Sequence, residues 1–151
     1  MNIKIIRANS ANTDFRKIIF DLESYLTGLD EEAHNACKEY NKLETINHVI
    51  IAYENKEIIG CGAIREYDKE TIEIKRMFVS DKFRKKGIAT RILIELENWA
   101  KEQGYITCIL ETGTMMLDAI SFYKKNNYIQ IPNYGQYSSK PKSICFSKSL
   151  K

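Results

Sequence analysis

The sequence predicts a single α/β domain of the α+β kind, in which about four helices flank one mixed, mostly antiparallel sheet of about seven strands. Two observations support this prediction. Segments with strand and helix patterns follow one another as strand, two helices, three strands, helix, strand, helix, two strands. The chain has 151 residues, only two prolines and no Gly/Ser-rich linker, so we expect one domain over residues 1–151.

The first half of the chain contributes four strands and two helices. Apolar runs predict strands over residues 3–6, 49–53, 58–64 and 72–79. The polar turn at residues 54–57 joins two of them as a hairpin. A first helix is predicted by helical spacing of Phe15, Ile18, Ile19, Leu22, Leu26 and Leu29. A second helix is predicted over residues 30–43, with one face formed by Ala33, Cys37 and Tyr40.

The second half alternates helices and strands. An amphipathic helix is predicted over residues 88–100, because one stripe carries Ile88, Ile92, Leu96 and Trp99. Gly104 is a suitable stop for it. A short helix is expected over residues 117–123, and strands over residues 106–110, 128–131 and 143–146.

The composition limits the class of protein. A net charge of +3 is too mild for a dedicated nucleic-acid binder, and no apolar run approaches the ~20 residues of a membrane span. His34 and His48 lack the spacing of a metal site or a nucleophilic triad. The cysteines form no zinc or redox motif (Cys37, Cys61, Cys108 and Cys145). We expect a cytoplasmic protein with reduced thiols and no metal, nucleic-acid or membrane partner.

The segment before the helix over residues 88–100 has the features of a phosphate-binding loop. It reads Arg84-Lys85-Lys86-Gly87-Ile88-Ala89. Gly87 lets the backbone bend and approach an anion. The helix start offers unpaired N–H groups and the positive end of its dipole. The segment is neither a Walker loop nor a dinucleotide-binding G-x-G-x-x-G. A basic turn before a surface helix is the alternative interpretation.

This loop resembles the Arg/Gln-x-x-Gly-x-Gly/Ala signature of the GNAT superfamily of acyl-CoA-dependent N-acetyltransferases. The segment Ala119-Ile120-Ser121-Phe122-Tyr123-Lys124-Lys125-Asn126-Asn127-Tyr128 is similar to a second GNAT motif, Ala-x-x-Phe-Tyr-x-x-x-Gly-Phe. The element order resembles the GNAT fold over essentially the whole chain, and the tail is similar to small single-domain bacterial members. Two positions depart from the pattern. Asn127 replaces a glycine, so we expect a positive φ that asparagine tolerates, and Met116 replaces an asparagine that contacts pantetheine in many relatives.

The resemblance implies acetyl-CoA as the acyl donor and no metal. The loop and the first helical turn would hold its pyrophosphate through Arg84, Lys85, Lys86, Gly87, Ile88, Ala89 and Thr90. In the family, the strand before the loop is splayed from its neighbour and its backbone pairs with the pantetheine amides. By position these residues are Met77, Phe78 and Val79, and one of their N–H groups would also polarise the thioester carbonyl. Their side chains are expected in the core.

The reaction needs a neutral amine, and an alkyl amine with a pKa near 10.4 is only about 0.1% neutral at pH 7. A base therefore helps. Glu73 interrupts an apolar strand and lies eleven residues before Arg84, the spacing of the general-base glutamate in the histone-acetylating branch of the superfamily. The alternative role for Glu73 is an ion pair with Lys75. Glu111 on the neighbouring strand is the rival as base or substrate ligand, and solvent is the third option.

Tyr123 is the candidate acid for the leaving thiolate, because it matches the tyrosine of the second motif. A thiol with a pKa near 8.5 leaves readily, so the acid's contribution is expected to be modest. A core aromatic on the helix face is the alternative role. Tyr134 lies in a late loop that either shapes the acceptor pocket or is an ordinary turn.

We therefore predict an acetyl-CoA-dependent N-acetyltransferase that acetylates a primary amine by direct attack in a ternary complex. The short chain favours a small-molecule acceptor. The alternatives are a protein or peptide acceptor and a non-catalytic acyl-CoA sensor. An acyl-cysteine route would require Cys108, because no cysteine lies near either motif. The sequence identifies neither the acceptor amine nor the oligomeric state, and a homodimer stays open.

Overall fold

The computed structural model describes residues 1–37 and 46–151, and in that part the chain forms one seven-stranded sheet with three α-helices. The elements are β1 (Ile3–Ala8), α1 (Thr13–Cys37), β2 (His48–Glu54), β3 (Glu57–Glu66), β4 (Thr71–Val79), α2 (Ile88–Glu102), β5 (Thr107–Gly113), α3 (Leu117–Lys125), β6 (Ile129–Ile131) and β7 (Ser143–Ser149), with short 3₁₀ turns η3 (Asp81–Phe83) and η4 (Gly135–Tyr137). The predicted α/β class and the seven strands are confirmed. Within the described residues, no helix is both long and apolar enough to cross a bilayer.

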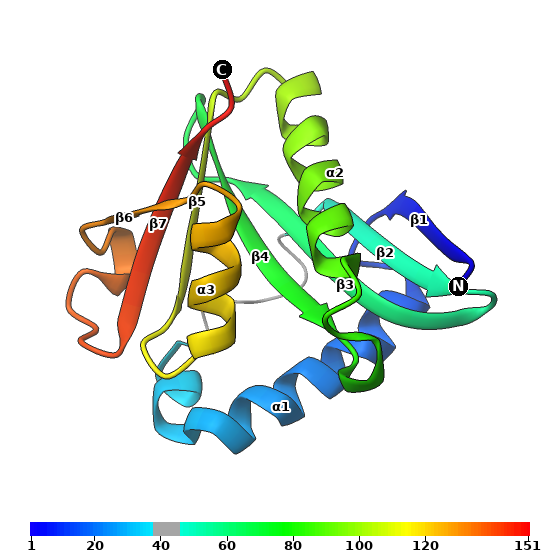
Figure 1. Ribbon diagram of the computed structural model, residues 1–151. Helices are drawn as coiled ribbons and strands as arrows, with labels where there is room; N and C mark the ends of the chain where they lie inside the picture. Colours follow the sequence, from blue (N-terminus) through cyan, green and yellow to red (C-terminus); the bar gives the residue numbers. More distant parts are fainter. Residues whose placement is uncertain (38–45) are drawn as a thin grey trace.

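The sheet opens between its two central strands. The strand order is β1-β2-β3-β4-β5-β7-β6, and only the β4–β5 pair is parallel. That pair is short, because residues 71–73 of β4 match residues 107–109 of β5 and no pairing follows. Beyond Glu73, β4 stays with β3 while β5 stays with β7. The two halves of the sheet therefore diverge as a V (Figure 1).

Each face of the sheet has its own apolar layer. On one face, α1 packs Phe15, Ile18 and Leu22 against Ile51 and Ala63. On the other face, α2 packs its stripe of Ile88, Ile92, Leu93 and Leu96 against inward residues of β2, β3 and β4, and α3 adds Tyr123. Because strand side chains alternate between faces, β4 and β5 present different residues to the two layers. The V-shaped opening connects the two sides.

The helix ends follow the sequence signals, with one correction. Gly104 has φ +93°, and the amides of Gly104 and Tyr105 donate to Lys101 and Ala100, which is a Schellman ending for α2. Asn127 has the expected positive φ of 72°. The two helices predicted before β2 are one helix as far as Cys37, because the junction has no proline and its single glycine, Gly28, weakens a helix without ending it. The predicted helix over residues 38–43 lies outside the described residues.

A β-bulge distorts the end of β4. Cys61 pairs with Phe78 and Ala63 with Lys75, so Gly62 alone faces both Arg76 and Met77. Arg76 takes the extra position with φ 60°, and its carbonyl accepts a hydrogen bond from the Cys61 thiol at 3.2 Å. Met77 consequently packs on the α2 side and Phe78 on the α1 side. The bulge sets which side chains reach the opening.

Candidate active site

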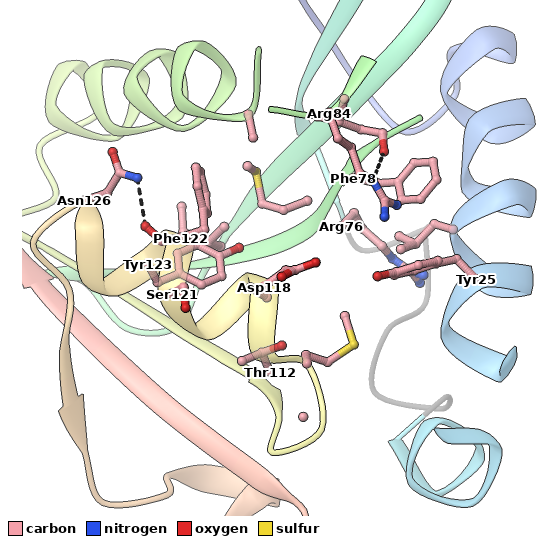
Figure 2. Close-up of a pocket in the computed structure, with 18 of the residues that line it drawn as sticks. Tyr25, Arg76, Phe78, Arg84, Thr112, Asp118, Ser121, Phe122, Tyr123 and Asn126 are labelled. Carbon is pink, nitrogen blue, oxygen red and sulfur yellow. Dashed lines mark hydrogen bonds between the residues drawn. The ribbon is translucent and has the colours of Figure 1, made fainter. Parts of the chain in front are cut away.

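A cleft of about 1260 Å³ occupies the opening between β4 and β5. Its walls are the end of β4, the loop into α2, the ends of β5 and α3, and residues 22, 25 and 26 of α1. Figure 2 shows Tyr25, Arg76 and Arg84 beside α1, with Phe122 and Tyr123 of α3 across from them. The predicted residues that line it are Met77, Phe78, Val79, Arg84, Lys85, Gly87, Ile88, Ala89, Thr90, Glu111 and Tyr123. Glu73, Lys86 and Tyr134 are not among the residues that line it.

The loop between β4 and α2 has the geometry of an anion cradle. Gly87 is the N-cap of α2, with φ 80° and ψ 5°, and Lys85 is also left-handed with φ 61°. The first helical hydrogen bond is donated by Arg91 to the Gly87 carbonyl at 3.1 Å, so the amides just before Arg91 have no helical acceptor. A Cβ added at Gly87 would meet no atom within 4 Å. The space beside Gly87 is therefore open, and the unpaired N–H groups and the positive end of the helix dipole face it.

Arg84 fixes the approach to this loop. Its Nε donates to the Val79 carbonyl at 2.8 Å, shown as a dashed line in Figure 2. Its guanidinium lies 4.4 Å from the centre of the Tyr25 ring and 5.5 Å from that of Phe78, which is cation–π geometry. Arg84 thus links the end of β4 to α1 and holds the loop in place. Lys86 instead lies over the Phe83 ring, 5.7 Å from its centre.

Tyr123 belongs both to the core and to the cleft. Its ring packs near Phe122, Tyr128 and Phe146, and the residue is buried. Its hydroxyl has no hydrogen-bond partner in the described part of the chain and points toward the middle of the cleft in Figure 2. Burial raises the pKa of Tyr123, so the hydroxyl keeps its proton at neutral pH. The core packing therefore orients a protonated hydroxyl toward the cleft.

Glu73 is held in a buried ion pair away from the cleft. Its side chain is 2% exposed, and Arg65 Nε donates to its Oε1 at 3.2 Å. The Tyr134 hydroxyl donates to Oε2. Lys75, the partner expected from strand spacing, donates instead to the Tyr137 hydroxyl at 3.0 Å. Both Glu73 oxygens are thus occupied, and Tyr134 contacts this carboxylate rather than the cleft.

Glu111 and Lys75 bring opposite charges to the cleft on the α1 side of the sheet. The Ser143 hydroxyl donates to Glu111 Oε2 at 2.7 Å. Burial raises the pKa of Glu111, and the Ser143 hydrogen bond and the charge of Lys75 oppose this. Burial lowers the pKa of Lys75, while the charges of Glu73 and Glu111 oppose it. Ionisable groups shifted in opposite directions are typical of proton-transfer sites.

Two lining residues were not singled out by sequence reasoning. Lys75 was predicted only as an ion-pair partner of Glu73, and Arg76 was not predicted as a site residue. Both line the cleft. The available signal was the run of charged residues, Glu73, Lys75 and Arg76, inside an otherwise apolar strand.

Cys108 has a structural environment. It is fully buried in the α2-side core and does not line the cleft. Burial raises the pKa of Cys108 to about 12, so its thiol is not a nucleophile at neutral pH. Among the residues that the structure describes, no three His, Cys, Asp or Glu side chains gather to hold a metal ion.

Comparison with known proteins decides the family. The model of the acetyltransferase (GNAT) family matches residues 13–128. The chain belongs to the GNAT acetyltransferase family. As a member, it is an acetyl-CoA-dependent N-acetyltransferase, and the phosphate-loop geometry and the parted strands fit that donor. The resemblance inferred from the two motifs is thereby confirmed.

Individual relatives match from two thirds to nearly all of the chain. An IAA acetyltransferase of Azospirillum brasilense is 28% identical over 151 residues, which are 99% of each protein. YsnE, an uncharacterized N-acetyltransferase of Bacillus subtilis, is 33% identical over 101 residues, 66% of this chain and 67% of YsnE. A GNAT acetyltransferase from Elizabethkingia anophelis, solved with acetyl-CoA bound, has a TM-score of 0.72 at 24% identity and covers 98% of both chains. That structure shares the fold.

Proposed function

We propose that this GNAT enzyme acetylates a primary amine of a small molecule by direct attack within a ternary complex. The observation that carries the proposal is the cleft through the parted strands. It joins the phosphate loop and Tyr123 on the α2–α3 side to Glu111 and Lys75 on the α1 side. Donor and acceptor can therefore enter from opposite faces of the sheet and meet between β4 and β5.

The donor side binds acetyl-CoA, which supplies an acyl group on a thioester. The unpaired amides at Gly87–Thr90 suit pyrophosphate oxygens, and Lys85 adds positive charge at the rim. Past Glu73, the β5-facing edge of β4 pairs with no strand among the residues that the structure describes. Its free amides suit the pantetheine arm, and one of them can stabilise the oxyanion that forms on the acyl carbonyl.

Glu111 is the base in this proposal. It lines the cleft, its carboxylate retains acceptor capacity beyond the Ser143 hydrogen bond, and burial raises its pKa toward the range of a useful base. Glu73 was the other candidate from the sequence. Its two oxygens already accept from Arg65 and Tyr134, so we assign it to holding the β6–β7 connection over the sheet.

Tyr123 is the acid in this proposal. Its hydroxyl reaches the cleft from α3, it is protonated at neutral pH, and it has no competing partner in the described residues. It would donate its proton to the departing sulfur as the carbon–sulfur bond breaks. The proton taken up by Glu111 comes from the acceptor nitrogen.

The proposal is tested by acetyl-CoA consumption, measured as free thiol, across amino acids, polyamines, aminoglycosides and peptides. Donor binding is measured separately by calorimetry with Gly87→Val. The matched control is Gly104→Val, because both glycines have positive φ and open space around a Cβ, but Gly104 lies at the far end of α2.

We expect Gly87→Val alone to abolish CoA binding while remaining folded. Equal CoA affinity in both variants would overturn the loop assignment. CoA binding without turnover of any amine would favour the sensor, and turnover of peptides alone would favour a protein acceptor.

A further inference from the structure

We infer that the amine acceptor also carries a carboxylate, and that Arg76 binds this carboxylate on the α1 side of the cleft. The inference rests on the proposed function and names its acceptor class. It follows from three features of Arg76: its position in the bulge, its incomplete hydrogen bonding and the charge of its surroundings.

The bulge directs Arg76 to the α1 side. In an unbroken strand, residue 76 would share a face with Ile72 and Ile74, which pack against the α2-side core. As the extra residue of the bulge, Arg76 instead reaches α1, where its Nη1 donates to Glu23 Oε1 at 2.8 Å. A left-handed conformation is unfavourable for arginine, and such strain is found preferentially at functional sites.

The guanidinium of Arg76 has unused donors. Its side chain is only 7% exposed, yet Nε is buried without a hydrogen-bond partner in the described structure. Glu23 occupies Nη1 and leaves the edge formed by Nε and Nη2 without a partner in the described residues. Buried donors nearly always have partners, and this edge of a guanidinium matches the two oxygens of a carboxylate. A small movement of the side chain on binding would complete the pair.

The charges around Arg76 favour a molecule with both an ammonium and a carboxylate. On this side of the cleft, Arg76 and Lys75 face two acidic groups, Glu23 and Glu111. An amine without a carboxylate would bring one more positive charge into this half-buried site. An amino acid brings no net charge, because its ammonium and its carboxylate cancel. This difference favours the amino acid, because desolvated groups of the same sign repel strongly.

Acceptors of graded length test the inference. The series of amino acids is glycine, β-alanine, 4-aminobutyrate, 5-aminopentanoate and 6-aminohexanoate. Each is compared with its carboxamide and with the alkylamine that lacks the carboxylate. We expect one length to be acetylated best, with kcat/KM above that of its carboxamide and its alkylamine by on the order of tenfold or more, as a charge-assisted hydrogen bond predicts. That length reports the span from Arg76 to the acyl carbon.

Arg76→Gln is the decisive variant, and Arg7→Gln is its matched control. Arg7 also pairs with glutamates, Glu95 and Glu102, but lies outside the cleft. We expect Arg76→Gln to raise KM for the best carboxylate acceptor on the order of tenfold, with kcat, the KM of the alkylamine and CoA affinity little changed. Arg7→Gln should keep the full preference for the carboxylate.

Inhibition of the wild-type enzyme by simple carboxylates tests the inference without depending on the folding of a variant. Propionate and butyrate should compete with an alkylamine acceptor and not with acetyl-CoA. The inference is overturned if carboxamides or alkylamines match the amino acids, or if these carboxylates do not compete. In either case, the proposed function still stands if the wild-type enzyme binds CoA and acetylates amines. A wild-type enzyme that does not bind CoA would refute the proposed function itself.

Discussion

Replacing Glu73 by glutamine should weaken the fold and leave most of the chemistry intact. The change removes the charge that faces Arg65 and turns a charge-assisted acceptor for the Tyr134 hydroxyl into a neutral one. Breaking a fully buried pair costs about 3–5 kcal/mol. Here the Arg65 side chain is 22% exposed and can gain water, so we expect a loss of about 2 kcal/mol in the free energy of unfolding. For a chain of this size that lowers the Tm by roughly 4–8 °C.

The assay pairs thermal unfolding with a pH–rate profile at saturating acetyl-CoA. Glu111→Gln should lower kcat/KM near pH 7 by on the order of 10²-fold or more. The kcat/KM of this variant should then rise by about tenfold per pH unit, because the free amine fraction grows by that factor. Glu73→Gln should keep the wild-type profile. If Glu73→Gln loses activity near pH 7 while Glu111→Gln does not, Glu73 is the base and the reasoning from its occupied oxygens is refuted. Wild-type profiles for both would assign deprotonation to solvent, with the site acting mainly by positioning.

Three further predictions concern Tyr123, the stability contribution of Glu111, and Gly62 opposite the bulge. Tyr123→Phe should lower kcat by up to about 10²-fold with little change in KM for acetyl-CoA, because packing stays and only the proton donor is removed; an unchanged kcat would make Tyr123 a core aromatic. Burial raises the pKa of Glu111 in the folded state. The protein therefore has its full stability below the unfolded-state pKa of Glu111, and loses stability as the pH rises through the folded-state pKa and the buried carboxyl becomes charged. Glu111→Gln should therefore melt above the wild type at neutral pH and equally in acid, as calorimetric scans would show. Gly62→Ala should destabilise by about 1–3 kcal/mol in urea unfolding, because its Cβ would lie 2.5 Å from Met77 Sδ and 2.8 Å from Leu96 Cδ1; an unchanged midpoint would mean that these flexible side chains move aside freely.

The sequence by itself determined the fold class, the family and the order of the elements, apart from the division of α1 into two helices. These follow from local patterns: apolar runs in the strands, helical spacing in α2, Gly104 beyond the end of α2, and the glycine of the loop before it. Such signals depend on neighbouring residues, so they can be read without knowing the fold. The loop at residues 84–89 and the motif around Tyr123 carried the family assignment for the same reason.

The tertiary structure alone decided which side chains share the cleft. Sequence spacing suggested Lys75 as the partner of Glu73, but Arg65 on β3 and Tyr134 beyond β6 take that place because strand register and the β6–β7 connection bring them there. The bulge that sends Arg76 to α1 depends on how β4 pairs with β3 around Gly62. The parting of β4 from β5 after three pairs opens the cleft. These are contacts between segments far apart in the chain, and no local pattern specifies their register.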